Sequence, residues 1–385
     1  MIDLMNATTI GLLAVGIVFV LDIILLVGLV GLKAYHRRRI QSHESRRAAY
    51  VAILSRHLAS EGSTERIAAD AADDDAFIDA VIDLRNVVSG GETETLTGLV
   101  DGLGVAERQV AKLRSRFPLG RRLRAAVSLA EIGDESTAPV LIEHLADREP
   151  EIRIQCARGL GRMRITMAID AILERLGRED PWVRVRFADT LIAYGAKATW
   201  PLTAYIRVNL GHDENRGVIE AIRVLGTIGD REVGPTLSGV LRVAADPEVQ
   251  LAAIEALGLV GGPMAIPPLD HALRSSDWRL RAKAATALGH IGDPTVNRAL
   301  AKRLTDDDWW VRRNSAAALA SLPGGDQLLL GAMRSADPFA RDAAAEALAD
   351  IGALTAARQR DEAGLAGEED LLLLEHVRAG DSVLV

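Results

Sequence analysis

The chain has 385 residues and a formal net charge of -8, with 49% hydrophobic residues but only 4% aromatic ones. Because no basic excess is available to neutralise a phosphate backbone, the composition argues against nucleic acid as a partner. The apolar content must come mainly from alanine, leucine, valine and isoleucine, which favours a closely packed all-α fold.

A long apolar run follows the short N-terminal segment 1–9 and covers residues 10–32. At about 1.5 Å of rise per residue, a helix of this length spans the hydrocarbon core of a bilayer, so the run predicts one transmembrane helix. A cleaved signal peptide is the alternative. It is disfavoured because no Lys or Arg precedes the run, and because the run is longer than the apolar region of a typical signal peptide.

The segment 33–48 is basic and contains Lys33, Arg37, Arg38, Arg39, Arg46 and Arg47. The positive-inside rule therefore places residues 1–9 outside and the rest of the chain in the cytoplasm. Setting this topology is the simplest role of the cluster, although it also suits anionic lipid headgroups.

Asp22 lies in the middle of the apolar run, where a carboxylate costs about 2.5–3.5 kcal/mol on insertion scales. We expect it to pair with a polar group of another transmembrane protein, and Gly16 and Gly28 would let a neighbouring helix approach closely. The alternative is a protonated Asp22 that the surrounding apolar residues tolerate.

Residues 49–117 have helical patterning, with a turn expected at Gly90-Gly91, and are interpreted as divergent helices that cap the following array. That array, residues 118–352, consists of eight repeats whose anchor leucines lie 29 to 34 residues apart. The anchors are Leu129, Leu160, Leu191, Leu225, Leu257, Leu288, Leu319 and Leu348. Residues 353–385 form a C-terminal cap and tail, with a short helix expected around Leu371–Leu374.

The residue pattern of each repeat predicts a helix that contains the anchor leucine. It starts at an acidic residue eleven positions before the anchor, as at Asp246 and Asp337, often with Pro next. The carboxylate caps free N–H groups, and Pro suits the first turn. The helix is expected to end four residues after the anchor at a glycine in the left-handed conformation, as at Gly133, Gly229, Gly292 and Gly352. A shorter first helix completes each unit.

The segment from Asp277 to Asp293 approaches the pattern D-P-x-V-R-x-x-A-A-x-A-L-G-x-I-G-D, which resembles bacterial HEAT-like repeats of the PBS-lyase type. The resemblance implies a right-handed α-solenoid of two-helix repeats, here preceded by one transmembrane helix, with the second helices lining the concave face. It also implies that Asp180 with Arg184, and Asp308 with Arg312, belong to a structural ladder. Pairing four residues apart on one helix face agrees with this role.

The sequence predicts neither an enzyme nor a cofactor, metal or small-molecule site. No phosphate-binding, zinc-protease or serine-hydrolase motif is present, and no two histidines have metal-ligand spacing. The single cysteine, Cys156, occupies a slot that alanine fills in other repeats, so we interpret it as a packed residue.

Two groups of residues are candidates for binding a protein partner. If the second helices face inward, a basic strip should line the groove: Arg158, Arg162, Arg186, Arg223, Lys283 and His290. Asp189, Glu220 and Glu255 interrupt this strip, and an ordinary solvated helix face is the alternative. Trp182, Trp278, Trp309 and Trp310 cluster at helix starts, where they either anchor a partner or cover the joint between repeats.

The resulting hypothesis is a scaffold, anchored in a bacterial inner membrane, that binds an integral membrane protein. Similar single-span repeat proteins accompany membrane glycosyltransferases, so the resemblance implies such an enzyme as the partner. A bilin lyase is the alternative function, because similar repeats occur in enzymes that attach bilins to phycobiliproteins.

Overall fold

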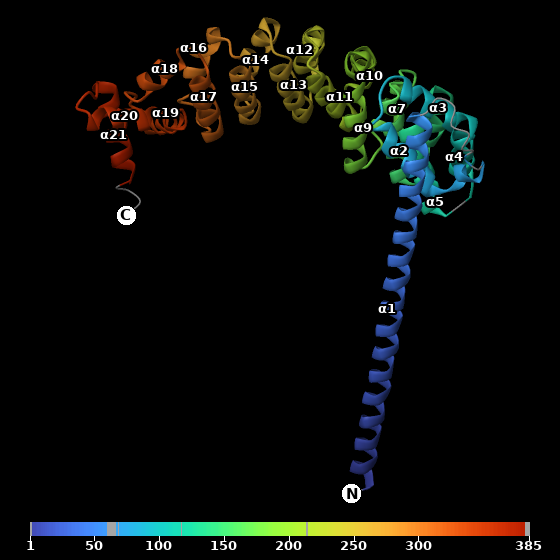
Figure 1. The fold of residues 1–385 in the computed structure, drawn as a ribbon. Helices are drawn as coiled ribbons and strands as arrows, with labels where there is room; N and C mark the ends of the chain where they lie inside the picture. Colours follow the sequence, from blue (N-terminus) through green and yellow to red (C-terminus); the bar gives the residue numbers. More distant parts are fainter. Residues whose placement is uncertain (1, 60–66, 68, 117, 213–214, 382–385) are drawn as a thin grey trace. The chain divides into compact units, whose positions relative to one another are not determined.

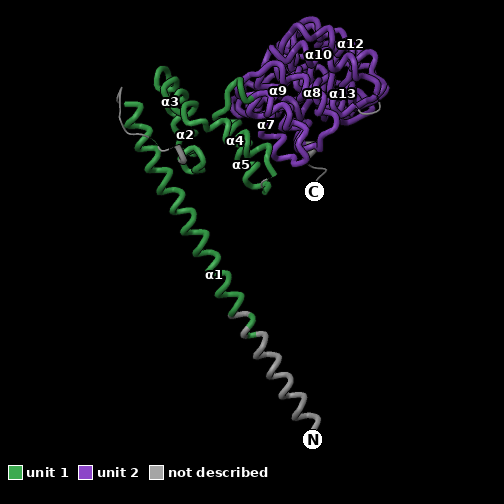
Figure 2. The backbone as a smooth tube through the Cα atoms, turned by 90° about the vertical axis from the view of Figure 1, so that its right-hand side faces the viewer, with its two compact units in different colours: residues 1–137 green, residues 138–385 purple. Residues whose placement is uncertain are grey.

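The structure, a computed structural model, describes the backbone of residues 2–59, 67, 69–116, 118–212 and 215–381. Every regular element in these ranges is a helix, which confirms the all-α prediction. The chain divides into two compact units, Met1–Thr137 and Ala138–Val385 (Figure 2). Side chains are described from residue 24 to residue 378 with short gaps, and before that only at Phe19 and Leu21.

The first unit is built on one long helix. It contains α1 (Ile2–Ala59), a 3-10 turn η1 (Ala69–Asp73), α2 (Asp75–Arg85), α3 (Gly91–Gly102), α4 (Val105–Arg114) and α5 (Leu119–Ile132). The turn expected at Gly90 is confirmed, since this residue has φ 64 immediately before α3. The apolar run, the basic segment and the start of the predicted cap region therefore belong to a single helix of 58 residues.

The core of the first unit lies at the C-terminal end of α1. Leu54 is fully buried there against Phe77 and Ile78 of α2. Tyr50 packs edge-on against Phe77, with the ring centroids 5.3 Å apart. These contacts hold the last turns of α1 on α2 and leave residues 24–42 of α1 exposed.

The second unit is a stack of two-helix repeats (Figure 1). The first helices are α6 (Ala138–Glu143), α8 (Ala168–Leu176), α10 (Thr199–Asn209), α12 (Gly234–Val243), α14 (Ile266–Ala272), α16 (Asn297–Ala301), α18 (Gly325–Ala332) and α20 (Ala353–Glu362). The second helices are α7 (Pro150–Arg162), α9 (Pro181–Tyr194), α11 (Arg216–Ile228), α13 (Pro247–Val260), α15 (Trp278–Ile291), α17 (Trp309–Ser321) and α19 (Pro338–Asp350).

The predicted helix boundaries hold for most repeats. The carboxylates of Asp246, Asp277, Asp308 and Asp337 accept hydrogen bonds from backbone N–H groups at the starts of α13, α15, α17 and α19. The anchor leucines from Leu129 to Leu319 are all 0% exposed. At the C-terminus, α21 (Glu368–Asp381) buries Leu373 and Leu374, which confirms the expected short helix.

The glycines after the anchors do not all close a helix in the same way. Gly229 and Gly292 end their helices in the left-handed conformation, as expected. Gly133 does not, because it is extended at φ -61, and a Cβ there would collide with the carbonyl of Leu129. Gly352 is left-handed but begins α20, since α19 already ends at Asp350.

A second set of glycines allows successive second helices to approach closely. A Cβ on Gly226 would lie 2.8 Å from Cα of Ala256, and one on Gly258 or Gly289 would lie 2.8 Å from Cβ of Ala287 or Ala318. Each glycine directly follows an anchor leucine, and each alanine directly precedes the next anchor. The recurring Ala-Leu-Gly segment is therefore a contact between repeats.

Gly258→Ala should destabilise the fold by about 1–3 kcal/mol, because the added methyl overpacks against Ala287. Gly239→Ala on α12 is the matched control, since its Cβ meets nothing within 4 Å and alanine is the better helix former. The comparison needs urea unfolding of both variants followed by circular dichroism. Equal midpoints for the two variants would contradict the close-contact interpretation.

The repeated arginine, seven residues before the anchor, has a structural role but not the predicted partner. Among the described residues, Asp308 forms no ion pair with Arg312. Instead, Arg312 Nη1 donates to the carbonyl of Asp306 at 2.7 Å. In the same way, Arg341 donates to the carbonyl of Ser335 at 2.7 Å. The side chain thus satisfies carbonyl groups of the turn between the two helices, which lack helical partners.

Two of these arginines also bind the next repeat. Arg153 Nε donates to Glu179 at 3.1 Å, and Arg281 Nε donates to Asp306 at 2.9 Å, so each pair joins residues 26 or 25 positions apart. Glu179 and Asp306 have side chains only 1% and 4% exposed. Burial raises the pKa of Asp306, but hydrogen bonds from Arg281 and from the Asp308 N–H outweigh it and hold the pKa below its ordinary value.

Because its pKa is lowered by folding, Asp306 contributes stability above about pH 4, and this contribution is lost as pH falls through the folded-state pKa. Asp306→Asn should therefore cost about 3 kcal/mol at pH 7, since it breaks a largely buried ion pair. The cost should shrink at pH 3. Urea midpoints at both pH values measure this difference, and an equal cost at pH 7 and pH 3 would argue against the ion pair.

Candidate protein-docking site

The second helices form one row of the repeat stack and expose a narrow face along it. Successive members of this row pack directly on one another, from α11 through α13 and α15 to α17 (Figure 1). The surface of this face comes from positions two, five, six and nine before the anchor leucines, at helical spacing, and most of them are exposed or half-buried. Side chains at these positions on neighbouring helices therefore become neighbours in space.

A groove of about 480 Å³ opens on this face across four consecutive second helices. Its lining residues are Arg223 of α11, Glu248, Leu251, Ala252 and Glu255 of α13, Trp278, Arg279, Ala282 and Lys283 of α15, and Trp310 and Asn314 of α17. The two indoles are 41% and 47% exposed, whereas Ala252 and Ala282 are buried. The groove thus combines a small-residue floor with aromatic and charged side chains.

Opposite charges are paired along the groove. Lys283 lies 3.3 Å from Glu255, and Arg279 lies 3.1 Å from Glu248, so both pairs join α13 to α15. Arg223 is 3.5 Å from Glu220 of its own helix. The lining contains three cationic and two anionic side chains, and each of the three cations has a carboxylate within 3.5 Å.

Asn314 and Asp277 stabilise the two helices that carry Trp278 and Trp310, α15 and α17. Asn314 Nδ2 donates to the carbonyl of Ala282 at 3.2 Å and so connects α17 to α15. The guanidinium of Arg279, at 2.9 Å, holds the pKa of Asp277 below its usual value. Asp277 is therefore ionised at neutral pH, where it caps the start of α15 directly before Trp278.

Of the six predicted basic residues, the structure brings only Arg223 and Lys283 together in this groove. Arg158 and Arg162 are exposed on α7, and His290 is exposed on α15 beyond the lining residues. Arg186 of α9 is 3.4 Å from Asp189. The predicted basic strip is therefore distributed over several repeats, and its members at the groove are already paired with carboxylates.

The predicted tryptophans also divide into groups. Trp278 and Trp310 line the groove, and Trp309 packs edge-on against Trp310 with the ring centroids 4.6 Å apart. Arg313 lies over the Trp309 ring at 5.5 Å, which orients that ring. Trp182 is 49% exposed on α9, outside the groove lining.

Six lining residues were not predicted: Glu248, Leu251, Ala252, Arg279, Ala282 and Asn314, and Glu255 was expected only as an interruption of the basic strip. Glu248 and Arg279 both stand nine positions before an anchor leucine, and Trp310 stands at the same place in its repeat. The repeat register therefore carries this signal, whereas four of the six predicted basic residues, Arg158, Arg162, Arg223 and His290, stand two positions before or after an anchor.

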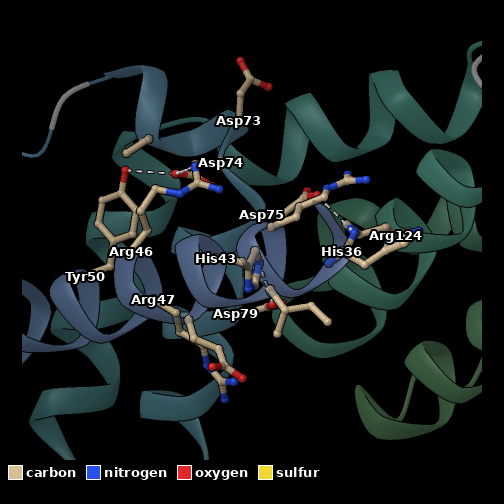
Figure 3. Close-up of a pocket in the computed structure, with 14 residues that line it drawn as sticks. His36, His43, Arg46, Arg47, Tyr50, Asp73, Asp74, Asp75, Asp79 and Arg124 are labelled. Carbon is tan, nitrogen blue, oxygen red and sulfur yellow. Dashed lines mark hydrogen bonds and ion pairs between the residues drawn. The ribbon is translucent and has the colours of Figure 1, made fainter. Parts of the chain in front are cut away.

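A separate cluster of charged residues joins α1 to α2 in the first unit and lines a pocket of about 910 Å³ (Figure 3). Arg46 of α1 lies 2.7 Å from Asp74, which also accepts a hydrogen bond from the Tyr50 hydroxyl at 3.3 Å. His43 is 3.4 Å from Asp79. Acidic residues of the η1–α2 region therefore neutralise part of the predicted basic segment.

Within the residues whose side chains are described, no helix is both long and apolar enough to cross a membrane. Much of the predicted span 10–32, including Gly16 and Asp22, lies outside those residues. Gly28 is described, and a Cβ there would meet nothing within 4 Å. The described part of the run carries exposed apolar side chains, among them Leu25 at 62% and Val30 at 60%.

The part of the chain with described side chains contains no cluster of three His, Cys, Asp or Glu residues suited to a metal ion. Cys156 is 0% exposed in α7, which agrees with its interpretation as a packed residue.

The repeats match known family models. A model of HEAT repeats matches residues 138–209, 208–279 and 269–349, which together span more than half of the chain. A model of the PBS lyase HEAT-like repeat matches residues 121–147. A search of curated protein sequences finds no match.

A comparison with solved structures gives matches at low identity. Human deoxyhypusine hydroxylase is 19% identical with a TM-score of 0.29, covering 68% of this chain and 99% of that one. The complex of CpcE and CpcF of phycocyanin lyase from Nostoc sp. PCC7120 is matched at 19% identity with a TM-score of 0.36. The match covers 40% of this chain and 98% of that one. Kap95p, solved with RanGDP, is matched at 14% identity with a TM-score of 0.47. The match covers 80% of this chain and 49% of that one.

Proposed function

This chain belongs to the HEAT-repeat family, and we propose that it is a membrane-anchored scaffold whose repeats bind a protein partner. The observation that carries the proposal is the groove across α11, α13, α15 and α17. It brings together Arg223, Trp278, Lys283 and Trp310, which lie up to 87 positions apart in the sequence.

The groove has the composition of a binding site for a segment of another protein. Tryptophan and arginine are enriched among the residues that dominate binding energy, and half-exposed indoles can bury further apolar area on binding. The paired carboxylates reduce the positive field, so charge alone would bind a ligand weakly. We therefore propose an acidic segment that also carries a large apolar side chain, placed between Trp278 and Trp310.

The proposed anchor is the apolar segment 10–32. Its support is the sequence, which is long enough to span a bilayer and is followed by cations, and the exposed apolar surface of the described part of α1. The anchor would place the repeats in the cytoplasm of a bacterium at the inner membrane. Asp22 would pair with a polar group of the partner within the bilayer.

The proposed partner is an integral membrane protein, since an anchored scaffold meets such proteins in the plane of the membrane. The resemblance to single-span repeat proteins that accompany membrane glycosyltransferases makes an accessory subunit of such an enzyme, or of a polysaccharide synthase, the specific form of the proposal. As a scaffold, the chain needs no catalytic residue.

A bilin lyase-like enzyme is the second candidate, favoured by the match of residues 121–147 to the PBS lyase HEAT-like repeat. The scaffold ranks above it because the single cysteine is buried in α7, where it cannot attack a substrate. Visible absorbance of the chain after co-expression with a bilin would reverse this order.

The double variant Trp278→Ala with Trp310→Ala should weaken partner binding by about several hundredfold and so reduce recovery strongly, because each aromatic anchor contributes about 2 kcal/mol. Arg223→Glu, made alone or with Arg158→Glu and Arg162→Glu, should also weaken recovery. The measurement is co-purification from the native membrane in mild detergent, quantified by mass spectrometry.

Trp200→Ala is the matched control for the groove variants. Trp200 is 77% exposed on α10, in the row of first helices, so its loss should leave recovery unchanged. Circular dichroism verifies that all variants retain their helix content. Full recovery with the double variant, or an equal loss with the control, would rule out the groove as the docking site.

Asp22→Leu should leave the chain resistant to alkaline extraction, because it removes the only charge of the apolar run. It should lower recovery of the membrane partner severalfold, since the pairing group in the bilayer is gone. Unchanged recovery would show that Asp22 is merely tolerated there.

A further inference from the structure

Four cations on α1 directly follow the exposed apolar segment. Lys33, Arg37, Arg38 and Arg39, here called the basic collar, are all exposed. In the part of the chain with described side chains, no acidic residue pairs with any of the four. The repeat groove differs in this respect, because its cations face carboxylates.

The remaining cations of the basic segment have partners within the protein. Arg46 lies 2.7 Å from Asp74 (Figure 3). Arg47 forms a bidentate ion pair with Asp83, at 2.5 Å. These ion pairs fix α1 on α2. The predicted basic cluster thus consists of a paired and an unpaired part, which meet at Arg39, since Arg39 lines the same pocket as Arg46 and Asp74 without forming an ion pair among the described residues.

The geometry of the basic collar identifies the kind of surface that it suits. At 100° per residue, Lys33, Arg37, Arg38 and Arg39 point to different sides of the helix, at about 0°, 40°, 140° and 240°. A single protein face beside α1 reaches only some of these directions. A layer that surrounds the helix reaches all of them.

The headgroup layer of a bilayer is such a surrounding layer. It is about 5–8 Å deep on each side of the hydrocarbon core. With Leu32 at the edge of the core, the collar runs from about 1.5 Å (Lys33) to about 10.5 Å (Arg39) along the helix, whereas Arg46 lies about 21 Å away. The backbones of Lys33 and Arg37 therefore lie within the headgroup layer. Arg38 and Arg39 lie just beyond it, where their long side chains reach back to the phosphate groups, and the ion pairs with Asp74 and Asp83 lie farther out.

We infer that the basic collar binds the headgroups of anionic phospholipids around α1. The inference rests on the proposed membrane anchor and extends it, since it assigns the collar a lipid ligand in addition to a role in topology. Guanidinium groups form bidentate bonds with phosphate oxygens, and three of the four collar residues are arginines. Each cation near an anionic surface contributes up to about a fivefold preference.

The test uses the full chain reconstituted in phosphatidylcholine vesicles with a trace of spin-labelled lipid. Electron paramagnetic resonance gives the relative association of spin-labelled phosphatidylglycerol against spin-labelled phosphatidylcholine. The wild type should prefer phosphatidylglycerol about fivefold or more. The variant Lys33→Gln/Arg37→Gln/Arg38→Gln/Arg39→Gln should show a ratio near one.

Arg46→Gln/Arg47→Gln is the matched control, and its lipid preference should equal that of the wild type. A wild-type ratio near one, or the same loss in both variants, would overturn the lipid assignment. Alkaline washing of the same vesicles separates this outcome from failure of the anchor. Wild-type chain that the wash removes refutes both proposals, whereas chain that resists the wash with a ratio near one refutes only the collar.

Discussion

A two-helix repeat cannot bury both of its apolar faces alone, and the rest of the second unit depends on how this constraint is met. The anchor leucines are fully buried, yet the close approach of their helices is set by smaller residues beside them. Gly258 against Ala287 and Gly289 against Ala318 leave no room for a methyl group. The low aromatic content follows from this packing, since bulky side chains would separate the helices.

The groove is a consequence of the same stacking. Because neighbouring second helices are in close register, positions nine before each anchor form a row that crosses the repeats. The ion pair between Glu248 and Arg279 belongs to this row, and Trp310 extends it on the next helix. Binding residues are thus assembled from several repeats, and no single repeat contains the site.

The fold was largely predictable from the sequence, because the signals for it are local. Acidic caps, glycine ends and anchor leucines each act within one helix. The anchor leucines and several caps are as predicted, whereas the left-handed glycine ends hold at Gly229 and Gly292 but not at Gly133 or Gly352. The partners of Arg153 and Arg281 were not predictable in this way. Glu179 and Asp306 belong to the following repeat, so the pairing depends on the stack and not on spacing within a helix. Membership of the groove has the same origin, since the place of Glu248 nine positions before its anchor gains meaning only when the repeats stack beside one another.

The central claim is that one face of the second helices holds a membrane partner beside an anchored chain. Its most direct test replaces Trp310, and separately Trp278, with a photo-crosslinking amino acid in the native membrane, with position 200 as reference. The account predicts that one and the same integral membrane protein is captured from both groove positions and not from position 200. Capture of different proteins at the two groove positions, or equal capture at position 200, would contradict it.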